Sequence, residues 1–239
     1  MTKIKLLSAL ALAVFAANAA TVVVSADPLL DRSTAGSIEF DNDTTTPVTP
    51  TNPQKPGTPL PIDPKDPDYP NEQITGPTGG LFLAYAPKNF SFGKHEVGAA
   101  DIFSGKVLTM EQIATPWNTT AYSQAIEVHD GRIDKHDWTL LAQLSTFDSG
   151  KLTGTTITIE NAKTSSEFAN QEPKLVQGAI TTISQTSSVE FLTANPQSKG
   201  DTSAVWYNPS DVKIHVPAKE ITKGTHKATV DWTLVAGAN

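Results

Sequence analysis

One tetrapeptide occurs twice in this chain, and each copy carries a tryptophan whose type and spacing suit ligand binding or core packing. Asp137-Trp138-Thr139-Leu140 and Asp231-Trp232-Thr233-Leu234 read identically, and their tryptophans lie 94 residues apart. An indole ring can stack its flat face on the apolar face of a sugar, or it can bury about 200 Å² in a protein core. The elements that carry the two copies decide between these uses.

Each copy lies in an alternating run of the kind that forms a β-strand, in which residues two positions apart share a face. Trp138 and Leu140 share a face with other apolar residues of their run, and Trp232 and Leu234 do the same in theirs. The spacing therefore predicts that all four are core residues. The alternative, that both rings line a glycan-stacking groove, stays open at this point.

If those tryptophans are core residues, ligand contacts should fall on turns. Trp117 follows Thr115-Pro116, and Trp206-Tyr207 precedes Asn208-Pro209. We therefore take Trp117, Trp206 and Tyr207 as candidate glycan contacts, with packing at the edge of the core as the alternative. A local basic stretch could meet an anionic polymer or form a solvated strand face and turn: Lys213, His215, Lys219, Lys223, His226 and Lys227.

No arrangement typical of a catalytic site accompanies these residues. His95-Glu96 lacks the second histidine of a zinc-protease motif. His129-Asp130 and His136-Asp137 are neighbours that would face opposite sides of a strand, and we interpret them as turn and surface polar residues. We expect no enzyme, cofactor or metal ligand, although scattered carboxylates leave a glycosidase pair as the alternative.

The first residues are typical of an export signal. Lys3 and Lys5 precede an apolar run, and Val24-Ser25-Ala26 is a small-residue cleavage site, so we assign residues 1–26 to a signal peptide. No later apolar run approaches the roughly 20 residues of a transmembrane helix. We expect a secreted, extracellular chain with no membrane span after cleavage.

Charge and cysteine content narrow the function classes further. Loss of the signal removes Lys3 and Lys5 and leaves 16 basic against 25 acidic side chains, a net charge of −9. Such a surface should be repelled by nucleic acid. The chain has no cysteine, so disulfides and thiolate metal sites are excluded and stability must come from an apolar core.

A proline-rich stretch divides the mature chain. Ten of the 17 prolines lie between Pro47 and Pro77, five of them at three-residue intervals that match polyproline II. We predict an N-terminal segment at 27–42 with a first strand at 37–40, a proline-rich loop at 43–77 and the main body of one domain at 78–239. The alternative is that 43–77 is a linker between a tail and a separate domain.

Short strand patterns separated by turn residues fill the main body. Alternation predicts strands at 81–86, 90–93, 122–128, 151–160, 177–184, 188–192, 203–207, 212–216 and 228–235, besides the first tetrapeptide copy, and brief helices at 110–114 and 167–171. This pattern indicates an all-β fold, an antiparallel β-sandwich or open barrel with a long proline-rich loop. The two tetrapeptides should occupy equivalent positions in facing or adjacent strands.

Duplicated Trp-x-Leu behind a signal and a proline-rich stretch resembles the WxL-domain surface proteins of Gram-positive bacteria. The resemblance implies non-covalent attachment to peptidoglycan through the WxL domain, at the cell wall, beside a companion WxL-interacting surface protein. We expect no covalent anchor, because no sorting sequence follows the second copy and Leu60-Pro61-Ile62-Asp63 is not one. The alternative is a structural or adhesive subunit that docks on another surface protein or a host matrix component.

Overall fold

The computed structural model describes residues 37–59, 76–87, 90–111, 124–133, 137–197 and 201–237. The chain divides into two units, Met1–Glu39 and Phe40–Asn239. In the first unit, the described residues 37–39 are exposed and have no regular secondary structure. The strand predicted at 37–40 is therefore wrong, because Ile38 and Phe40 are each 78% exposed and no described strand pairs with them.

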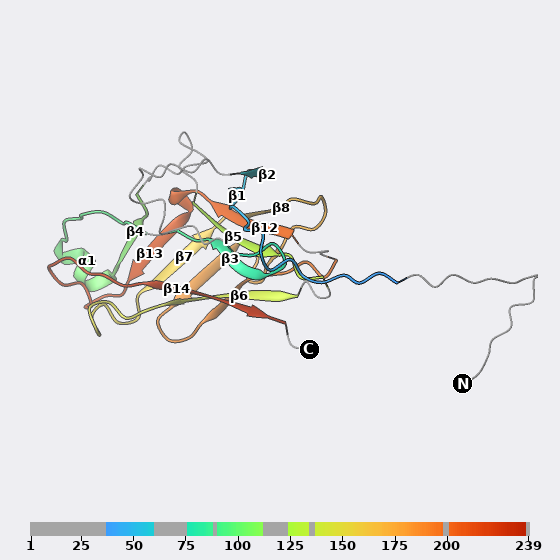
Figure 1. Ribbon diagram of the computed structural model, residues 1–239. Coiled ribbons are helices and arrows are strands. Elements are labelled where there is room, and N and C mark those ends of the chain that lie inside the picture. Colours follow the sequence, from blue (N-terminus) through green and yellow to red (C-terminus); the bar gives the residue numbers. More distant parts are fainter. Residues whose placement is uncertain are drawn as a thin grey trace, which may run out of the picture. The chain divides into compact units, whose positions relative to one another are not determined.

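Three four-stranded antiparallel sheets build the second unit (Figure 1). The β7 sheet has the order β10 (Ile180–Ser184), β7 (Thr156–Glu160), β13 (Val212–Val216) and β4 (Lys106–Thr109). The β6 sheet has the order β14 (Val230–Ala236), β6 (Trp138–Leu144), β11 (Val189–Thr193) and β9 (Lys174–Leu175). The β5 sheet has the order β3 (Leu81–Tyr85), β5 (Gln124–Asp130), β12 (Asp201–Tyr207) and β8 (Lys163–Ser166).

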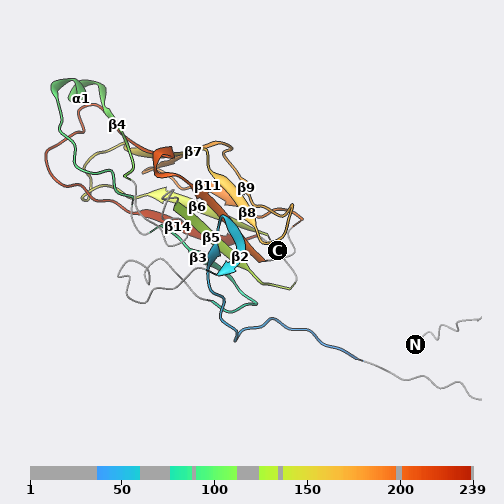
Figure 2. The same cartoon turned by 90° about the horizontal axis from the view of Figure 1, so that it is seen from above.

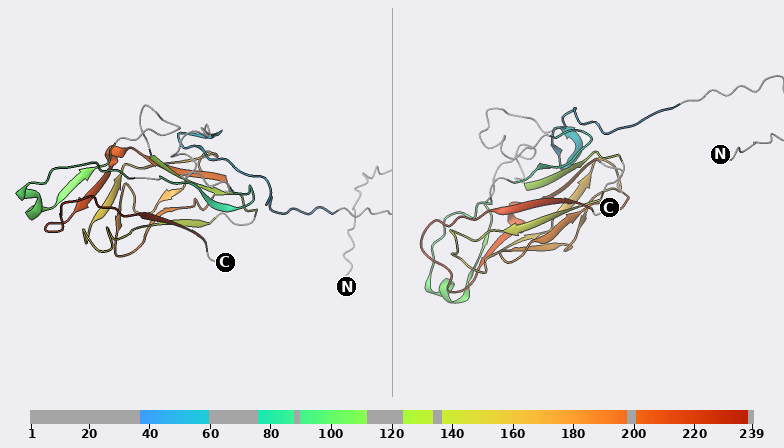
Figure 3. Two further views of the ribbon diagram at one scale, coloured as in Figure 1. Left: turned by 60° about the vertical axis from the view of Figure 1, so that its left-hand side comes forward. Right: turned by 60° about the horizontal axis from the view of Figure 1, so that its bottom comes forward.

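Three smaller elements complete the unit. A two-stranded hairpin joins β1 (Thr51–Asn52) to β2 (Lys55–Pro59), and a 3-10 turn, η1 (Pro209–Asp211), links β12 to β13. Helix α1 (Ala99–Ser104) has no buried residue. The views of Figures 1 to 3 place this helix at the opposite end of the unit from the last described residues.

Alternating burial explains why these segments pair as strands. In β6 the side chains alternate between buried and half-buried along all seven residues, and in β7 Ile157 and Ile159 are buried between half-buried neighbours. One face of each strand thus loses its apolar surface to a core while the other keeps polar groups near water.

One apolar core joins the three sheets. Its buried members from the central strands of the three sheets include Ile126, Val128, Leu140, Leu144, Ile157, Ile159, Phe191, Val205, Val212 and Ile214. The predicted all-β antiparallel fold is confirmed, and the sheets described here form a sandwich-like stack without closing into a barrel.

Strand β5 is buried along its whole length because something covers its second face. Ile126 and Val128 point into the core, while the side chain of Glu127 points the other way and binds the proline-rich stretch. The Glu127 carboxylate accepts hydrogen bonds from the Thr51 backbone N–H at 2.9 and 3.0 Å and from the Thr51 hydroxyl at 3.0 Å. These three hydrogen bonds come from two donor groups of Thr51 and reach both oxygens of the buried carboxylate.

Further bonds fasten the described parts of the proline-rich stretch to the same unit. The Val48 N–H donates to the Gly76 carbonyl at 2.9 Å, beside a bridge between Pro47 and Pro77. The Ser165 hydroxyl of β8 donates to the Pro53 carbonyl at 2.6 Å. The β1–β2 hairpin accordingly lies beside the β5 sheet in Figures 2 and 3. We call residues 43–59 with 76–80 the strap.

The remaining differences from the sequence predictions concern short segments. Residues 90–93 form no strand, and residues 167–171 form bends and a turn instead of a helix. Most of the helix predicted at 110–114 lies outside the described residues. The alternation rule did not predict α1, β4, β8 or β9, because each is at most six residues long and too short for a clear period.

Candidate functional site

The two tetrapeptide copies lie on adjacent hydrogen-bonded strands of the β6 sheet. β6 and β14 pair antiparallel with Leu140 opposite Leu234 and Trp232 opposite Ala142. Directly opposed residues share a face, so both Trp-x-Leu pairs point to the same side of the sheet. Figure 1 shows the two strands side by side, and β6 begins where β14 ends, near the last described residues.

The first copy is inside the molecule. Trp138 is 3% exposed and Leu140 is fully buried. The backbone carbonyl of Trp138 accepts hydrogen bonds from the Ala194 N–H at 2.9 Å and from the Thr193 hydroxyl at 3.0 Å. This ring packs within the core and offers no free face to a ligand.

The second copy lies at the margin of the same core. Trp232 and Leu234 are half-buried and pack against the core, with the Trp232 ring centroid 5.4 Å from that of Phe191. β14 is the edge strand of its sheet, whereas β6 lies between β14 and β11. Identical residues at the same spacing therefore have different exposure, because one copy has a strand on each side and the other has a strand on one side.

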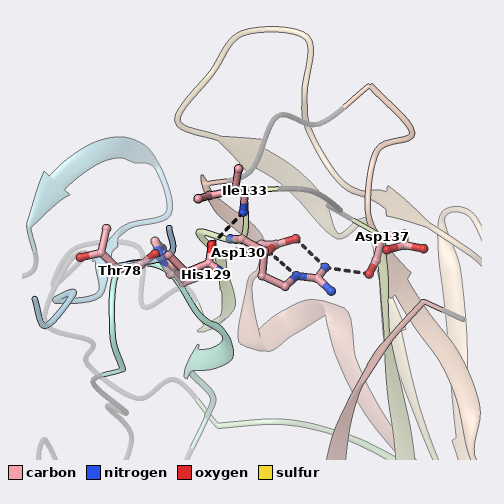
Figure 4. A network of polar contacts seen from close by, with 7 residues as sticks. Thr78, His129, Asp130, Ile133 and Asp137 are labelled. Atoms are coloured by element: carbon pink, nitrogen blue, oxygen red, sulfur yellow. Dashed lines mark hydrogen bonds and ion pairs between the residues drawn. The ribbon is translucent and has the colours of Figure 1, made fainter. Parts of the chain in front are cut away.

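A polar network holds the start of the first copy (Figure 4). The Arg132 guanidinium donates to both carboxylate oxygens of Asp130 at 2.8 and 2.9 Å and to the Asp137 carbonyl at 2.9 Å. Hydrogen bonding to Asp130 raises the pKa of Arg132. The Gly237 N–H donates to the same Asp137 carbonyl at 3.0 Å, which ties the end of β14 into this network.

The network also reaches Thr78 of the strap and Asn42, the residue just before the strap. His129 Nε2 donates to the Thr78 carbonyl at 2.8 Å, and the Ile133 N–H donates to the Asn42 side-chain oxygen at 3.0 Å. His129 and Asp130 are 5% and 1% exposed, so the interpretation of this pair as surface residues is wrong. Their position at the end of β5 suggested a turn, but Thr78 of the strap contacts His129, and Arg132 binds the buried Asp130 carboxylate. His136 lies outside the described residues.

Trp206 is the candidate glycan contact that remains accessible. The cross-strand register places Trp206 opposite Ala125 and Lys163, on the face of the β5 sheet that carries the strap. Its ring is half-buried, and the Lys163 ammonium lies 4.7 Å from the ring centroid. A cation at this distance is attracted to the face of the indole.

The other two candidates differ from Trp206. Tyr207 points into the core and is 1% exposed, and burial raises the pKa of its phenol. A glycan cannot reach this ring, because adjacent residues on a strand face opposite sides and Trp206 takes the outer one. Trp117 lies outside the described residues.

An open face of the β7 sheet is rich in hydroxyl groups. Its outward rows run Thr109, Lys213, Thr158, Thr182 and Val107, His215, Thr156, Ser184 across the four strands, all half-buried or exposed. Lys213 pairs with Glu160 at 2.7 Å, so the cation of this face is locally balanced. Part of the basic stretch is thus a solvated strand face.

Another part of the basic stretch fastens the turn before β14. His226 Nδ1 contacts the Asp148 carboxylate at 2.7 Å, and the Lys227 N–H donates to that carboxylate at 3.2 Å. The hydrogen bond from His226 is the main cause of the lowered pKa of Asp148. Asp148 follows β6, so the exit of the first copy and the entry of the second are held together.

Within the described ranges, no three His, Cys, Asp or Glu side chains gather as a metal site would require. A search of the same residues finds no helix long and apolar enough to span a membrane. The described surface thus offers an indole beside an ammonium, a hydroxyl-rich sheet face and strand edges, which are binding features.

These features define an all-β binding module with paired Trp-x-Leu strands. Residues 30–237 match the family described as WxL domain surface cell wall-binding, so the chain belongs to that family. The family is a cell-surface binding family and a non-enzymatic kind of domain. No curated protein and no solved structure matches the chain.

Proposed function

We propose that this protein is secreted and binds peptidoglycan non-covalently through its WxL domain. The observation that carries the proposal is the match to a cell-wall-binding family over residues 30–237, which includes both Trp-x-Leu copies. An export signal at 1–26 would bring the chain to the wall. The glycan strand or its peptide stem is the ligand we propose.

The surface supports binding by stacking and hydrogen bonding. Trp206 offers an indole at the surface, and the Lys163 ammonium beside it would pair with a stem-peptide carboxylate. The open β7 face adds the hydroxyls of Thr158 and Thr182, which both donate and accept. Because the mature chain carries a net charge of −9, attraction to an anionic polymer as a whole is not the driving force.

Cosedimentation tests this proposal. The mature protein, residues 27–239, is mixed with sacculi stripped of proteins and anionic polymers, and the pellet is assayed over a range of salt concentrations. We expect the protein in the pellet with little change as salt rises, because stacking is weakly screened. Protein that stays in the supernatant would overturn the proposal.

A matched pair of variants locates the contact. Trp206→Ala should weaken sacculus binding several-fold when binding is measured well below its thermal midpoint, which truncation of a half-buried ring lowers. Phe103→Ala is the control, since Phe103 is an aromatic residue on α1 that is 76% exposed. Equal binding by both variants would remove Trp206 from the site and leave the open β7 face to be tested.

Assembly with a companion surface protein is the second candidate function. Exposed apolar residues gather around α1 and β4: Val97, Ile102, Phe103 and Val107 are 45%, 41%, 76% and 59% exposed. A cluster of this kind is typical of a protein-binding surface. Phe103→Ser should then abolish capture by the ectodomain of a companion surface protein and leave sacculus binding unchanged, whereas unchanged capture would exclude this surface.

A further inference from the structure

Hydrogen-bonded and non-hydrogen-bonded residue pairs alternate along the β6–β14 ladder. This alternation shows which backbone groups of β14 face away from β6. The Gly237 N–H donates to the Asp137 carbonyl, and the Ser145 N–H donates to the Thr229 carbonyl. These directly opposed pairs fix the alternation of an antiparallel ladder, so the odd-numbered residues of β14 bond to β6. The even-numbered residues present their N–H and C=O groups at the outer edge: Val230, Trp232, Leu234 and Ala236.

The same residues have incomplete side-chain cover. Val230, Trp232 and Leu234 are half-buried and pack against the core from its margin. No described strand pairs with the outer edge of β14. The seven residues of β14 therefore have outward backbone groups that no described strand satisfies, together with a row of partly exposed apolar side chains. An edge of this kind is a template for an added strand.

We propose that the outer edge of β14 pairs antiparallel with β14 of a second copy of this chain, about a two-fold axis at Thr233. This register opposes Trp232 to Leu234 of the other copy, and the contact occurs twice by symmetry. Val230 would lie opposite Ala236 of the other copy. Even-numbered residues meet even-numbered residues, so the outward N–H and C=O groups of both strands pair as the antiparallel ladder requires.

Charge placement agrees with this register. The one charged residue of β14 is Asp231, and the two-fold places it opposite Val235 of the other copy instead of opposite a second carboxylate. Cross-strand pairs of an aromatic with an aliphatic side chain are stabilising, while directly opposed like charges are not. The strand is thus self-complementary over its whole length in a single centred register.

Pairing would give the second Trp-x-Leu copy a neighbouring strand on its open side, as β11 does for the first copy. A strand on the outer edge of β14 gives Trp232 and Leu234 a neighbour on each side, as Trp138 and Leu140 have within the β6 sheet. If the proposed wall binding holds, a dimer would also carry two wall-binding surfaces and gain avidity. The self-association itself does not depend on wall binding.

Cysteine cross-linking tests both the contact and its register. The protein has no cysteine, so Thr233→Cys introduces a single thiol at the two-fold axis. Odd-numbered residues form the closer, non-hydrogen-bonded pairs, whose Cα atoms lie about 4.5 Å apart, within reach of a disulfide. Mild oxidation of mature Thr233→Cys should give a covalent dimer on a non-reducing gel.

Two matched variants distinguish cross-linking in this register from cross-linking by random collisions between molecules. Asp231→Cys lies opposite Val235, so alone it should cross-link about tenfold more slowly than Thr233→Cys, because its own copies lie too far apart. A mixture of Asp231→Cys with Val235→Cys should form a mixed dimer. Cross-linking of Thr233→Cys no faster than Asp231→Cys would overturn the proposal.

Sedimentation velocity of the unmodified mature protein provides the second measurement. We expect a monomer–dimer equilibrium that shifts toward dimer as salt rises, because two acidic copies repel at low ionic strength. Ala236→Pro removes one outward N–H without removing a bond to β6 and should weaken the dimer about tenfold or more. Val235→Thr is the control, since it leaves the outer edge intact. A monomer at every concentration and salt would refute the inference.

Discussion

The two Trp-x-Leu copies share one sequence and one sheet face but differ in their surroundings. Trp138 and Leu140 lie on a strand flanked on both sides and are buried, whereas Trp232 and Leu234 lie on an edge strand and are half-buried. The difference teaches that the motif specifies a strand face and that topology then decides the exposure. A residue pattern alone does not distinguish a core anchor from a surface at the margin of the core.

The polar contacts that hold the two copies in place also differ in burial, and again the first copy is the more buried. The start of the first copy is held by Arg132 and Asp130, and Asp130 is 1% exposed. The entry to the second is held by His226 and Asp148, a pair at the surface. We therefore expect the second copy to open before the first when the protein is perturbed.

The largest expected effect separates the two tryptophans. Trp138→Ala should lower the free energy of unfolding by about 3–5 kcal/mol, since it leaves a cavity in the core. Trp232→Ala should cost about 1–3 kcal/mol, because its ring is half-buried. Chemical denaturation of both variants measures the difference, and a larger loss for Trp232→Ala would reverse the comparison.

The next effect concerns the support of the first copy. Arg132→Met removes two hydrogen bonds to the Asp130 carboxylate and one to the Asp137 carbonyl, and should cost about 1.5–3 kcal/mol. Lys227→Met, at an exposed residue beside the second copy, is the control and should stay close to the parent protein. Equal denaturation midpoints for both variants would argue against a buried support.

A smaller effect tests whether the copies act as neighbours. Leu140 and Leu234 are directly opposed across β6 and β14. A double-mutant cycle with alanine at both positions should show a coupling of about 0.5–1 kcal/mol. Additive losses within error would mean that the two leucines reach separate parts of the core.

The smallest effect is the pH dependence of the contact that supports the second copy. The hydrogen bond from His226 lowers the pKa of Asp148, so its stabilisation is present above the unfolded value near 4 and is lost as pH falls through the lowered folded pKa. Asp148→Asn should therefore lower the thermal midpoint at about pH 6 and have less effect at about pH 2.5. A difference that is unchanged by pH would assign the loss to packing.

The sequence predicted the elements with long, regular alternation. The strand faces at Trp138, Ile157 and Ile214 follow from period two, because each strand buries one face in a common core. The antiparallel all-β fold follows from the same pattern. The adjacency of the two Trp-x-Leu strands was one of two arrangements that the sequence left open.

Long-range contacts explain what the sequence did not predict. Glu127 gives no local sign that it will bind Thr51, 76 residues away, and His129 gives none that its ring will bond to Thr78 of the strap, 51 residues away. Trp206 and Tyr207 are adjacent on β12, so their side chains lie on opposite faces of the sheet, and only one of them can be on the outer face. The turn residues Asn208-Pro209 suggested that both rings are exposed, because a turn does not show which face of the preceding strand is buried.

The place of β14 at the sheet edge also determines how the domain would respond to force. A load applied to the chain beyond Gly237 and directed across β14 would break the backbone bonds to β6 one after another, beginning at the pair of Ala236 with Trp138. A strand sheared along its length must break many bonds together. Tension across the strand would therefore release β14 at low force and leave the central β6 strand in place.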